Sequence, residues 1–144
     1  MKVRDLLKDK QQALVTVGLD DTLHVASQRL AEHNIGVVLV MDEAGKPVGV
    51  LSERDVVRQF ARHGGGCESL LAREVMTEDP IIGVPDDELA EVATIMTKEH
   101  IRHMPIVDGG VIVGLISIRD VVQAEQRASN AELRRLRMHL NSMV

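Results

Sequence analysis

Two short segments of the chain place a hydroxyl, a guanidinium and a carboxylate within four residues of each other. Both follow the pattern Gly-aliphatic-aliphatic-Ser-x-Arg-Asp-Val-Val, at residues 49–57 and 114–122. A carboxylate can accept hydrogen bonds from both hydroxyls of a ribose. A Ser at a helix start, together with the backbone N–H groups of the first turn, suits a phosphate. The pattern therefore predicts half of a nucleotide site, twice, at Ser52, Arg54, Asp55, Ser117, Arg119 and Asp120.

The same residues also have a purely structural interpretation. Each Ser is a good helix N-cap, and each Asp three positions later completes a pattern like a capping box. Spacing alone favours this interpretation, and the Ser residues could serve both roles. The Arg of each segment could reach an α-phosphate with its planar guanidinium or could point to solvent. Both alternatives stay open at the level of the residues.

The two segments occupy equivalent places in an internal repeat. Residues 20–23 match residues 86–89 at an offset one residue longer than that of the repeated run, and the difference falls in the turn-rich stretches 42–47 and 108–110. A deletion of one residue is tolerated in a turn. Near the start of each copy, residues 3–7 also correspond to the stretch 70–77. The chain is therefore expected to form the same α+β unit twice.

Each repeat predicts the order β-α-β-β-α. Short β-rich runs come first, then an acidic pair suited to a helix N-terminus, a helix with one apolar stripe, a hairpin and a second helix that begins at the Ser. The expected strands lie at 14–17, 37–41 and 48–51 in the first repeat and at 81–84, 104–107 and 113–116 in the second. The acidic pairs are Asp20-Asp21 and Asp86-Asp87.

Four segments are expected along the chain. They are a first repeat at 1–62, a connector at 63–69, a second repeat at 70–125 and a C-terminal helix at 126–144. The connector holds Gly64-Gly65-Gly66 and Cys67, so it is expected to be flexible, with the thiol exposed. The C-terminal helix carries an apolar stripe among basic residues. This stripe would either fold back on its own domain or form a dimer contact.

The doubled Ser-x-x-Asp run and the segment Arg102-His103-Met104-Pro105-Ile106 together resemble the CBS domain, named for cystathionine β-synthase. The resemblance covers residues 1 to about 125 and is greatest to stand-alone bacterial proteins that consist of a CBS pair. It implies tandem CBS repeats packed about a pseudo-two-fold axis, here followed by the C-terminal helix. It also implies two clefts that bind AMP, ADP, ATP or a related adenosyl ligand such as NAD or S-adenosylmethionine, with AMP the preferred candidate.

The resemblance further implies that each cleft combines both repeats. One cleft would set Asp120 and Ser117 against Thr16 and the edge Ile35-Gly36-Val37. The other would set Asp55 and Ser52 against Ile82 and the edge Ile101-Arg102-His103-Met104-Pro105. Because the second edge carries Arg102 and His103, the cleft of Asp55 is expected to prefer a phosphorylated ligand.

Composition narrows the function further. The net charge of −5 argues against general nucleic-acid binding, which needs a basic surface. No apolar run approaches the roughly 20 residues that span a bilayer, so a cytoplasmic protein without a membrane is expected. Neither a catalytic constellation nor a metal motif is found.

The preferred hypothesis is thus a non-catalytic homodimeric sensor that acts on an unidentified regulated protein. A ligand-free scaffold that works through dimerisation and its C-terminal helix is the main alternative, and an enzyme is the other.

Overall fold

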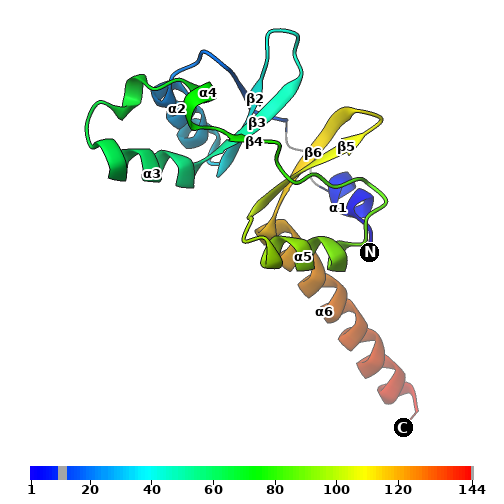
Figure 1. Cartoon of the computed structure of the whole chain (residues 1–144). Coiled ribbons are helices and arrows are strands. Elements are labelled where there is room, and N and C mark those ends of the chain that lie inside the picture. The colour runs from blue at the N-terminus through cyan, green and yellow to red at the C-terminus, as the bar shows by residue number, and fades with distance from the viewer. Residues whose placement is uncertain (10–12, 144) are drawn as a thin grey trace. The chain divides into compact units, whose positions relative to one another are not determined.

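The computed structural model describes residues 1–9 and 13–143 and divides the chain into two compact units (Figure 1). The first, which we call the outer unit, joins residues 1–11 to residues 82–144; the second, the central unit, comprises residues 12–81. Each has its own hydrophobic core. The units are described separately below.

The central unit is built on a four-stranded sheet of order β1-β2-β3-β4. Strands β1 and β2 are parallel, whereas β3 is antiparallel to both β2 and β4. The elements are β1 (Thr16–Gly18), α2 (Leu23–His33), β2 (Val37–Met41), β3 (Pro47–Ser52), α3 (Glu53–His63), the 3-10 helix η1 (Cys67–Ser69), α4 (Ala72–Val75) and β4 (Thr77–Glu78). The apolar sides of α2 and β2 form the core with η1 and α4.

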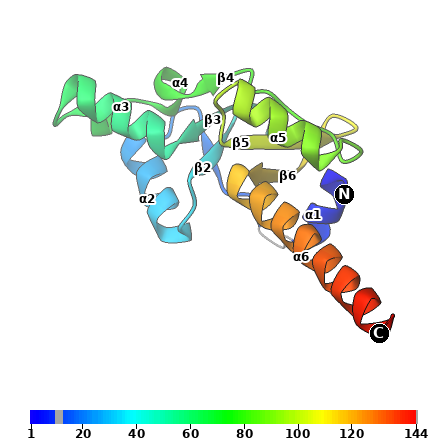
Figure 2. The ribbon, with the colours of Figure 1, turned by 90° about the horizontal axis from the view of Figure 1, so that it is seen from below.

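The outer unit contains α1 (Val3–Asp9), α5 (Leu89–Lys98), β5 (His103–Asp108), β6 (Val111–Ser117) and α6 (Ile118–Ser142). Strands β5 and β6 form an antiparallel hairpin, and α5 and α6 lie side by side next to it (Figure 2). The strand expected at 81–84 is reduced to a single parallel bridge between Gly83 and Ile106, so this prediction was wrong. The other expected strands and both hairpins are confirmed, and so is the α+β class.

The missing residue of the second repeat is explained by its hairpin turn. Only Gly109 and Gly110 separate β5 from β6, and both have positive φ, 59° and 80°. A two-residue type I′ hairpin turn requires positive φ at both positions, which glycine adopts without steric penalty. The first hairpin uses the longer loop 42–46 instead.

A short helical segment from the start of each repeat packs away from that repeat. In the outer unit, α1 docks at the entrance to α5, where the amide of Val3 donates to the carbonyl of Asp87 at 2.9 Å and the amide of Arg4 to that of Pro85 at 2.9 Å. Val3 is completely buried there. The segment that begins the first repeat is therefore part of the core of the second.

The central unit repeats this arrangement with α4. The amide of Ala72 donates to the carbonyl of Asp21 at 2.8 Å, and that of Arg73 donates to Leu19 at 3.1 Å. Ala72 is completely buried, like its counterpart in α1. The expected correspondence between residues 3–7 and 70–77 is confirmed, and it marks an exchange of segments between the two repeats.

Close packing of the exchanged segments explains the glycine that opens the repeated run. A Cβ on Gly49 would lie 2.7 Å from the carbonyl oxygen of Thr77 and 2.9 Å from the sulfur of Met76. A Cβ on Gly114 would lie 2.5 Å from a methyl group of Leu7. Both contacts are shorter than van der Waals packing allows. The glycine therefore belongs to the docking surface for the exchanged segment.

The sequence predicts that each acidic pair caps the helix that follows it, but neither pair does so. Helix α2 is capped by Thr22, whose hydroxyl accepts from the amide of Val25 at 3.2 Å. Asp20 instead pairs with Arg73 of the exchanged segment at 2.7 Å, and Asp21 accepts from the amide of Gly18 at 2.7 Å. Asp21 therefore stabilises a turn, and Asp20 helps to hold α4 in place through a tertiary contact.

Two further expectations need correction. Cys67 is only 7% exposed and belongs to the core of the central unit, so the thiol is not exposed in a free connector. The C-terminal helix is not a separate element at 126–144, because α6 runs without interruption from Ile118 to Ser142. Val144 lies outside the described residues. In the part of the chain that is described, no helix combines the length and hydropathy needed to cross a membrane.

Candidate functional site

The carboxylate of Asp55 is held at the start of α3 by a complete capping box. Its Oδ2 accepts from the amide of Ser52 at 2.8 Å and from the Ser52 hydroxyl at 3.1 Å, and its own amide donates to that hydroxyl at 3.3 Å. Asp55 is 8% exposed, and Oδ1 lies 3.8 Å from the guanidinium of Arg58. A nearly buried carboxylate is thus fixed in one orientation.

The start of α6 has the same construction. Oδ2 of Asp120 accepts from the amide of Ser117 at 2.8 Å, and the amide of Asp120 donates to the Ser117 hydroxyl at 3.1 Å. The structural interpretation of the two Ser-x-x-Asp runs is therefore confirmed. For Asp55 it leaves a ligand role open, since a carboxylate has about four acceptor positions and the capping box uses only part of them.

The strand edges expected in the site lie beside the helix starts of their own units. In the central unit, Val37 pairs with Ser52 across β2 and β3, and the carbonyl of Gly36 accepts from the amide of Glu53 at 2.9 Å. Thr16 lies on the other side of β2, opposite Leu39. The sheet thus positions this edge next to the first capping box.

In the outer unit, the edge that carries Arg102 and His103 lies next to the second capping box. His103 pairs with Ser117 across β5 and β6, and the carbonyl of Arg102 accepts from the amide of Ile118 at 2.8 Å. Arg102 is exposed and His103 is half-buried. Arg102 and His103 therefore share a unit with Asp120, and how they face Asp55 stays a prediction.

The remaining expected residues differ widely in exposure. Met104 and Pro105 are buried in β5, and Ile35 and Ile101 are half-buried where the chain enters a strand. Ile82 is exposed. The side chains of Arg54 and Arg119 are exposed as well, so each could reach a ligand or solvent. Arg58, which lies one turn after Asp55, was missed, although its i,i+3 spacing was a usable signal.

A separate apolar pocket of about 430 Å³ lies in the central unit between α2, α3 and η1. Phe60 and Val57 border it, together with the buried Cys67. Glu68 also lines the pocket, and hydrogen bonds from its own amide and that of Gly66 lower the pKa of its carboxyl. The residues expected in a nucleotide site do not line this pocket. Among the described residues, no cluster of His, Cys, Asp and Glu suited to a metal ion is present.

The fold is a duplicated α+β module with a matching capping box in each repeat. The family model of the CBS domain matches residues 3–62 and 72–127, which is most of the chain. The chain belongs to the CBS domain family.

Solved structures agree with this assignment. A CBS-domain containing protein from Agrobacterium tumefaciens is 35% identical and has a TM-score of 0.83, with 86% of this chain and 92% of that one covered. A CBS domain protein from Pyrobaculum aerophilum, complexed with AMP, is 26% identical with a TM-score of 0.74, over 83% of this chain and 89% of that one.

A third structure is the CBS domain pair of protein MJ0100 in complex with 5′-methylthioadenosine and S-adenosyl-L-methionine. It is 25% identical, with a TM-score of 0.76, and covers 89% of this chain and 98% of that one. Among curated sequences, this chain spans only 58%, 61% and 62% of the length of three relatives that it matches at 30–34% identity.

Proposed function

We propose that this protein is a regulatory module that binds an adenosyl ligand through its two Ser-x-x-Asp helix starts and does no chemistry on it. The observation that carries the proposal is the pair of capping boxes, each of which fixes a carboxylate beside a strand edge. Two proteins of the same family and fold were solved with adenosyl compounds. AMP is the preferred ligand, with ADP, ATP, NAD and S-adenosylmethionine as the other candidates.

The proposed role of Asp55 follows from its hydrogen-bonding capacity, and Asp120 is assigned the same role because it occupies the equivalent place in the repeat. Oδ2 of Asp55 is used by the capping box, whereas the nearest cation to Oδ1 that the structure records is Arg58 at 3.8 Å. Oδ1 can therefore accept from ribose hydroxyls without loss of the cap. The completion of each site by the other repeat stays a prediction from the family resemblance.

Ligand would act by favouring one arrangement of the module over another. It can shift such an equilibrium only by the difference between its affinities for the two states. We propose that the module works as a cytoplasmic homodimer and passes this shift to an unidentified regulated protein.

Ligand binding is tested first by thermal unfolding with AMP, ATP, NAD and S-adenosylmethionine at millimolar concentration. A ligand at 100 times its Kd stabilises the folded state by about 2.7 kcal/mol, which is a shift of several degrees in Tm. If none of the four compounds raises Tm, the sensor hypothesis is wrong and the scaffold alternative takes its place.

The site is tested by Asp55→Asn and Asp120→Asn in isothermal titration calorimetry. Asn keeps one oxygen for the capping box but replaces the second acceptor with a donor, so the fold is retained while the ribose contact is lost. We expect the affinity for the nucleotide to fall about tenfold or more at a site that uses the carboxylate. Asp108→Asn, at the exposed end of β5, is the control and should have no effect. Unchanged affinity in both site variants would remove the assignment.

A further inference from the structure

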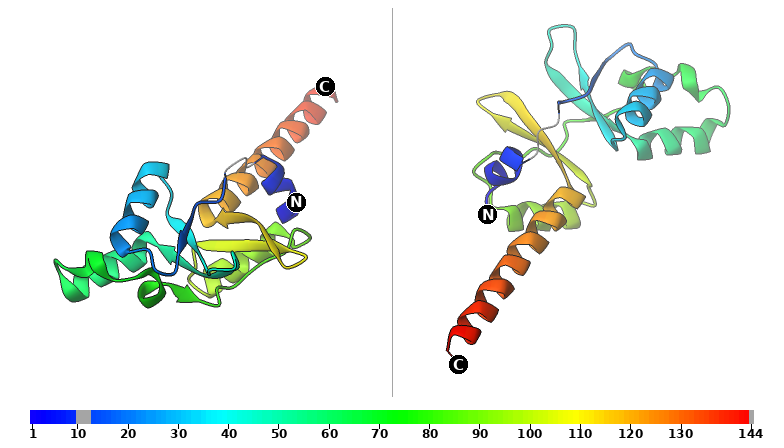
Figure 3. Two further views of the ribbon diagram at one scale, coloured as in Figure 1. Left: turned by 90° about the horizontal axis from the view of Figure 1, so that it is seen from above. Right: turned by 180° about the vertical axis from the view of Figure 1, so that it is seen from behind.

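The second half of α6 leaves the outer unit and packs against nothing that the structure describes. Val121 and Ala124 are its buried residues, whereas every residue from Glu125 to Met143 is exposed. Figure 3 shows this half extending beyond the rest of the unit. The alternative in which the helix folds back on its own domain is therefore wrong. An isolated helix of this length is only marginally stable in water.

The exposed half carries apolar residues at coiled-coil spacing. Leu133, Leu136, Leu140 and Met143 follow one another at intervals of three, four and three, which are the a and d positions of a heptad. Their exposed fractions are 52%, 54%, 62% and 71%. Four large apolar side chains thus form one stripe, which we call the α6 seam.

The α6 seam lies on a different side of the helix from the face that packs on the outer unit. At 100° per residue, the centre of the seam lies about 110° around the helix axis from Val121 and Ala124. A second helix can therefore reach the seam without displacing α5 or the hairpin.

The charges beside the seam indicate which partner fits it. Glu132 occupies the g position before Leu133, and Arg137 occupies the e position five residues later. In a parallel pair, the g residue of one helix faces the e residue of the next heptad of the other, so Glu132 would meet Arg137 of a second copy twice. In an antiparallel pair with the same seam, Arg137 would face its own copy, and like charges would repel.

We propose that the α6 seam is the contact surface for a second copy of this chain, paired as a parallel two-stranded coiled coil. The seam spans about three helical turns, so the pairing is reversible and depends on protein concentration. Two-fold symmetry uses the same surface on both copies and leaves no unpaired end. The inference is independent of the proposed nucleotide site.

Self-association is measured by sedimentation velocity on the full chain over a series of concentrations. Leu136→Glu places a charge at the centre of the seam, so the dimer dissociation constant should rise at least about tenfold. Met138→Glu introduces the same charge two residues later on the opposite face, which is also exposed, and should leave association unchanged. Circular dichroism checks that both variants retain the helix.

The charge pair is tested by reversal. Glu132→Arg and Arg137→Glu should each weaken the dimer about two- to fivefold, since each replaces an attractive contact with a repulsive one. The double variant restores the opposite-charge arrangement and should regain the affinity of the wild-type chain. Additive losses in the double variant would contradict the parallel pairing.

Orientation is tested by Met143→Cys. Equivalent d positions face each other in a parallel pair, so this variant should form an intermolecular disulfide under mild oxidation. The wild-type chain is the control for Cys67, which is buried. Dimers that form through another surface would not cross-link here and would be unaffected by Leu136→Glu, which would overturn the proposal. A monomeric wild-type chain would overturn the proposal as well.

Discussion

Each repeated run contains a Gly, a Ser and an Asp with three different roles. Gly49 and Gly114 admit the exchanged segment, Ser52 and Ser117 cap a helix, and the Asp that follows each Ser closes the cap and is proposed to hold ribose. All of them lie at or close to a strand-to-helix junction, with each Gly three residues before the capping Ser. A substitution that breaks the cap is expected to lower both stability and ligand affinity, whereas Asp→Asn keeps one oxygen for the cap.

Gly49→Ala should destabilise the central unit by about 1–3 kcal/mol, because the new methyl group meets the backbone oxygen of Thr77, which cannot move freely. Gly114→Ala should have a smaller effect, since its methyl group meets the flexible end of Leu7. Urea unfolding measures both. The combination Gly114→Ala with Leu7→Ala should show favourable coupling in a double-mutant cycle, and strict additivity would contradict the contact.

Arg102→Gln separates recognition of phosphate from recognition of the nucleoside. The side chain of Arg102 is exposed, so loss of its charge should not disturb the fold. We expect the affinity for AMP to fall roughly threefold to tenfold while that for adenosine stays the same, because only AMP presents an anion. Equal losses for the two ligands, measured by calorimetry, would show that Arg102 does not contact the phosphate.

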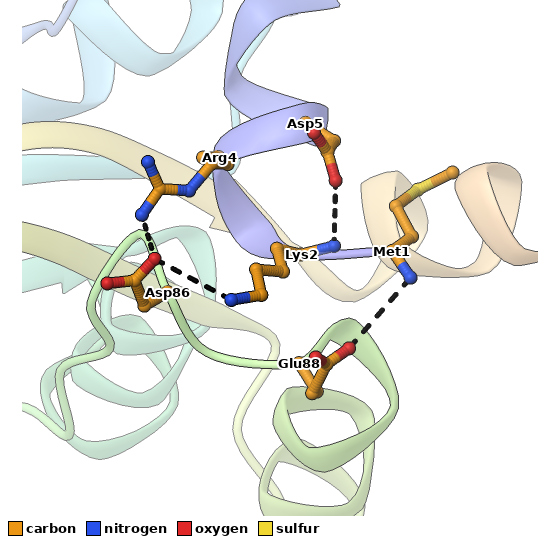
Figure 4. A network of polar contacts seen from close by, with 6 residues as sticks. All are labelled: Met1, Lys2, Arg4, Asp5, Asp86 and Glu88. Carbon is orange, nitrogen blue, oxygen red and sulfur yellow. Dashed lines mark hydrogen bonds and ion pairs between the residues drawn. The ribbon is translucent and has the colours of Figure 1, made fainter.

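At the level of elements, α1 is held by both burial and charge. Figure 4 shows Asp86 between Arg4 and Lys2, with the amino group of Met1 3.9 Å from Glu88. These side chains are about half exposed, so the ion pairs contribute little free energy each. Backbone hydrogen bonds and the buried face of α1 contribute more.

Leu6→Ala should therefore destabilise the outer unit by about 2–4 kcal/mol, because Leu6 is 7% exposed and belongs to its core. Arg4→Ala should change the free energy of unfolding by less than about 1 kcal/mol. Thermal or urea unfolding compares the two. If the order were reversed, the charge network of Figure 4 would be the dominant contact of α1.

For the molecule as a whole, the boundaries of the sequence repeats differ from those of the compact units. The family model matches from residue 3 to residue 62, whereas the compact central unit comprises residues 12–81. The core of that unit includes Ala72 and Val75, which lie beyond the matched repeat. The chain is expected to unfold in units that ignore the repeat boundary.

This expectation can be tested with two fragments. A fragment of residues 12–81 should unfold cooperatively on heating, because it contains the complete sheet and core of the central unit. A fragment of residues 1–62 should lack a cooperative transition, since it loses α4, β4 and the side chains that cover β3. A cooperative transition in the shorter fragment alone would contradict the exchange.

The sequence by itself determined the duplication, both hairpins and the two capping boxes. These features depend on periodicity, turn residues and caps that act over a few neighbouring positions, such as Ser52 on Asp55. The apolar run 81–84 is predicted as a strand but forms only a single bridge at Gly83. An apolar run does not reveal how many of its backbone groups will pair with a neighbouring strand.

Only the tertiary structure decided which distant segments meet. Val3 docks against Asp87, and Asp20 pairs with Arg73, although no local rule connects these residues. The burial of Cys67 likewise depends on segments that are distant in the sequence. The stripe on α6 was evident in the sequence, but its exposure was not. Whether an apolar face is covered depends on the direction in which its helix leaves the core. The second half of α6 extends away from the core of its unit, so its apolar stripe stays exposed.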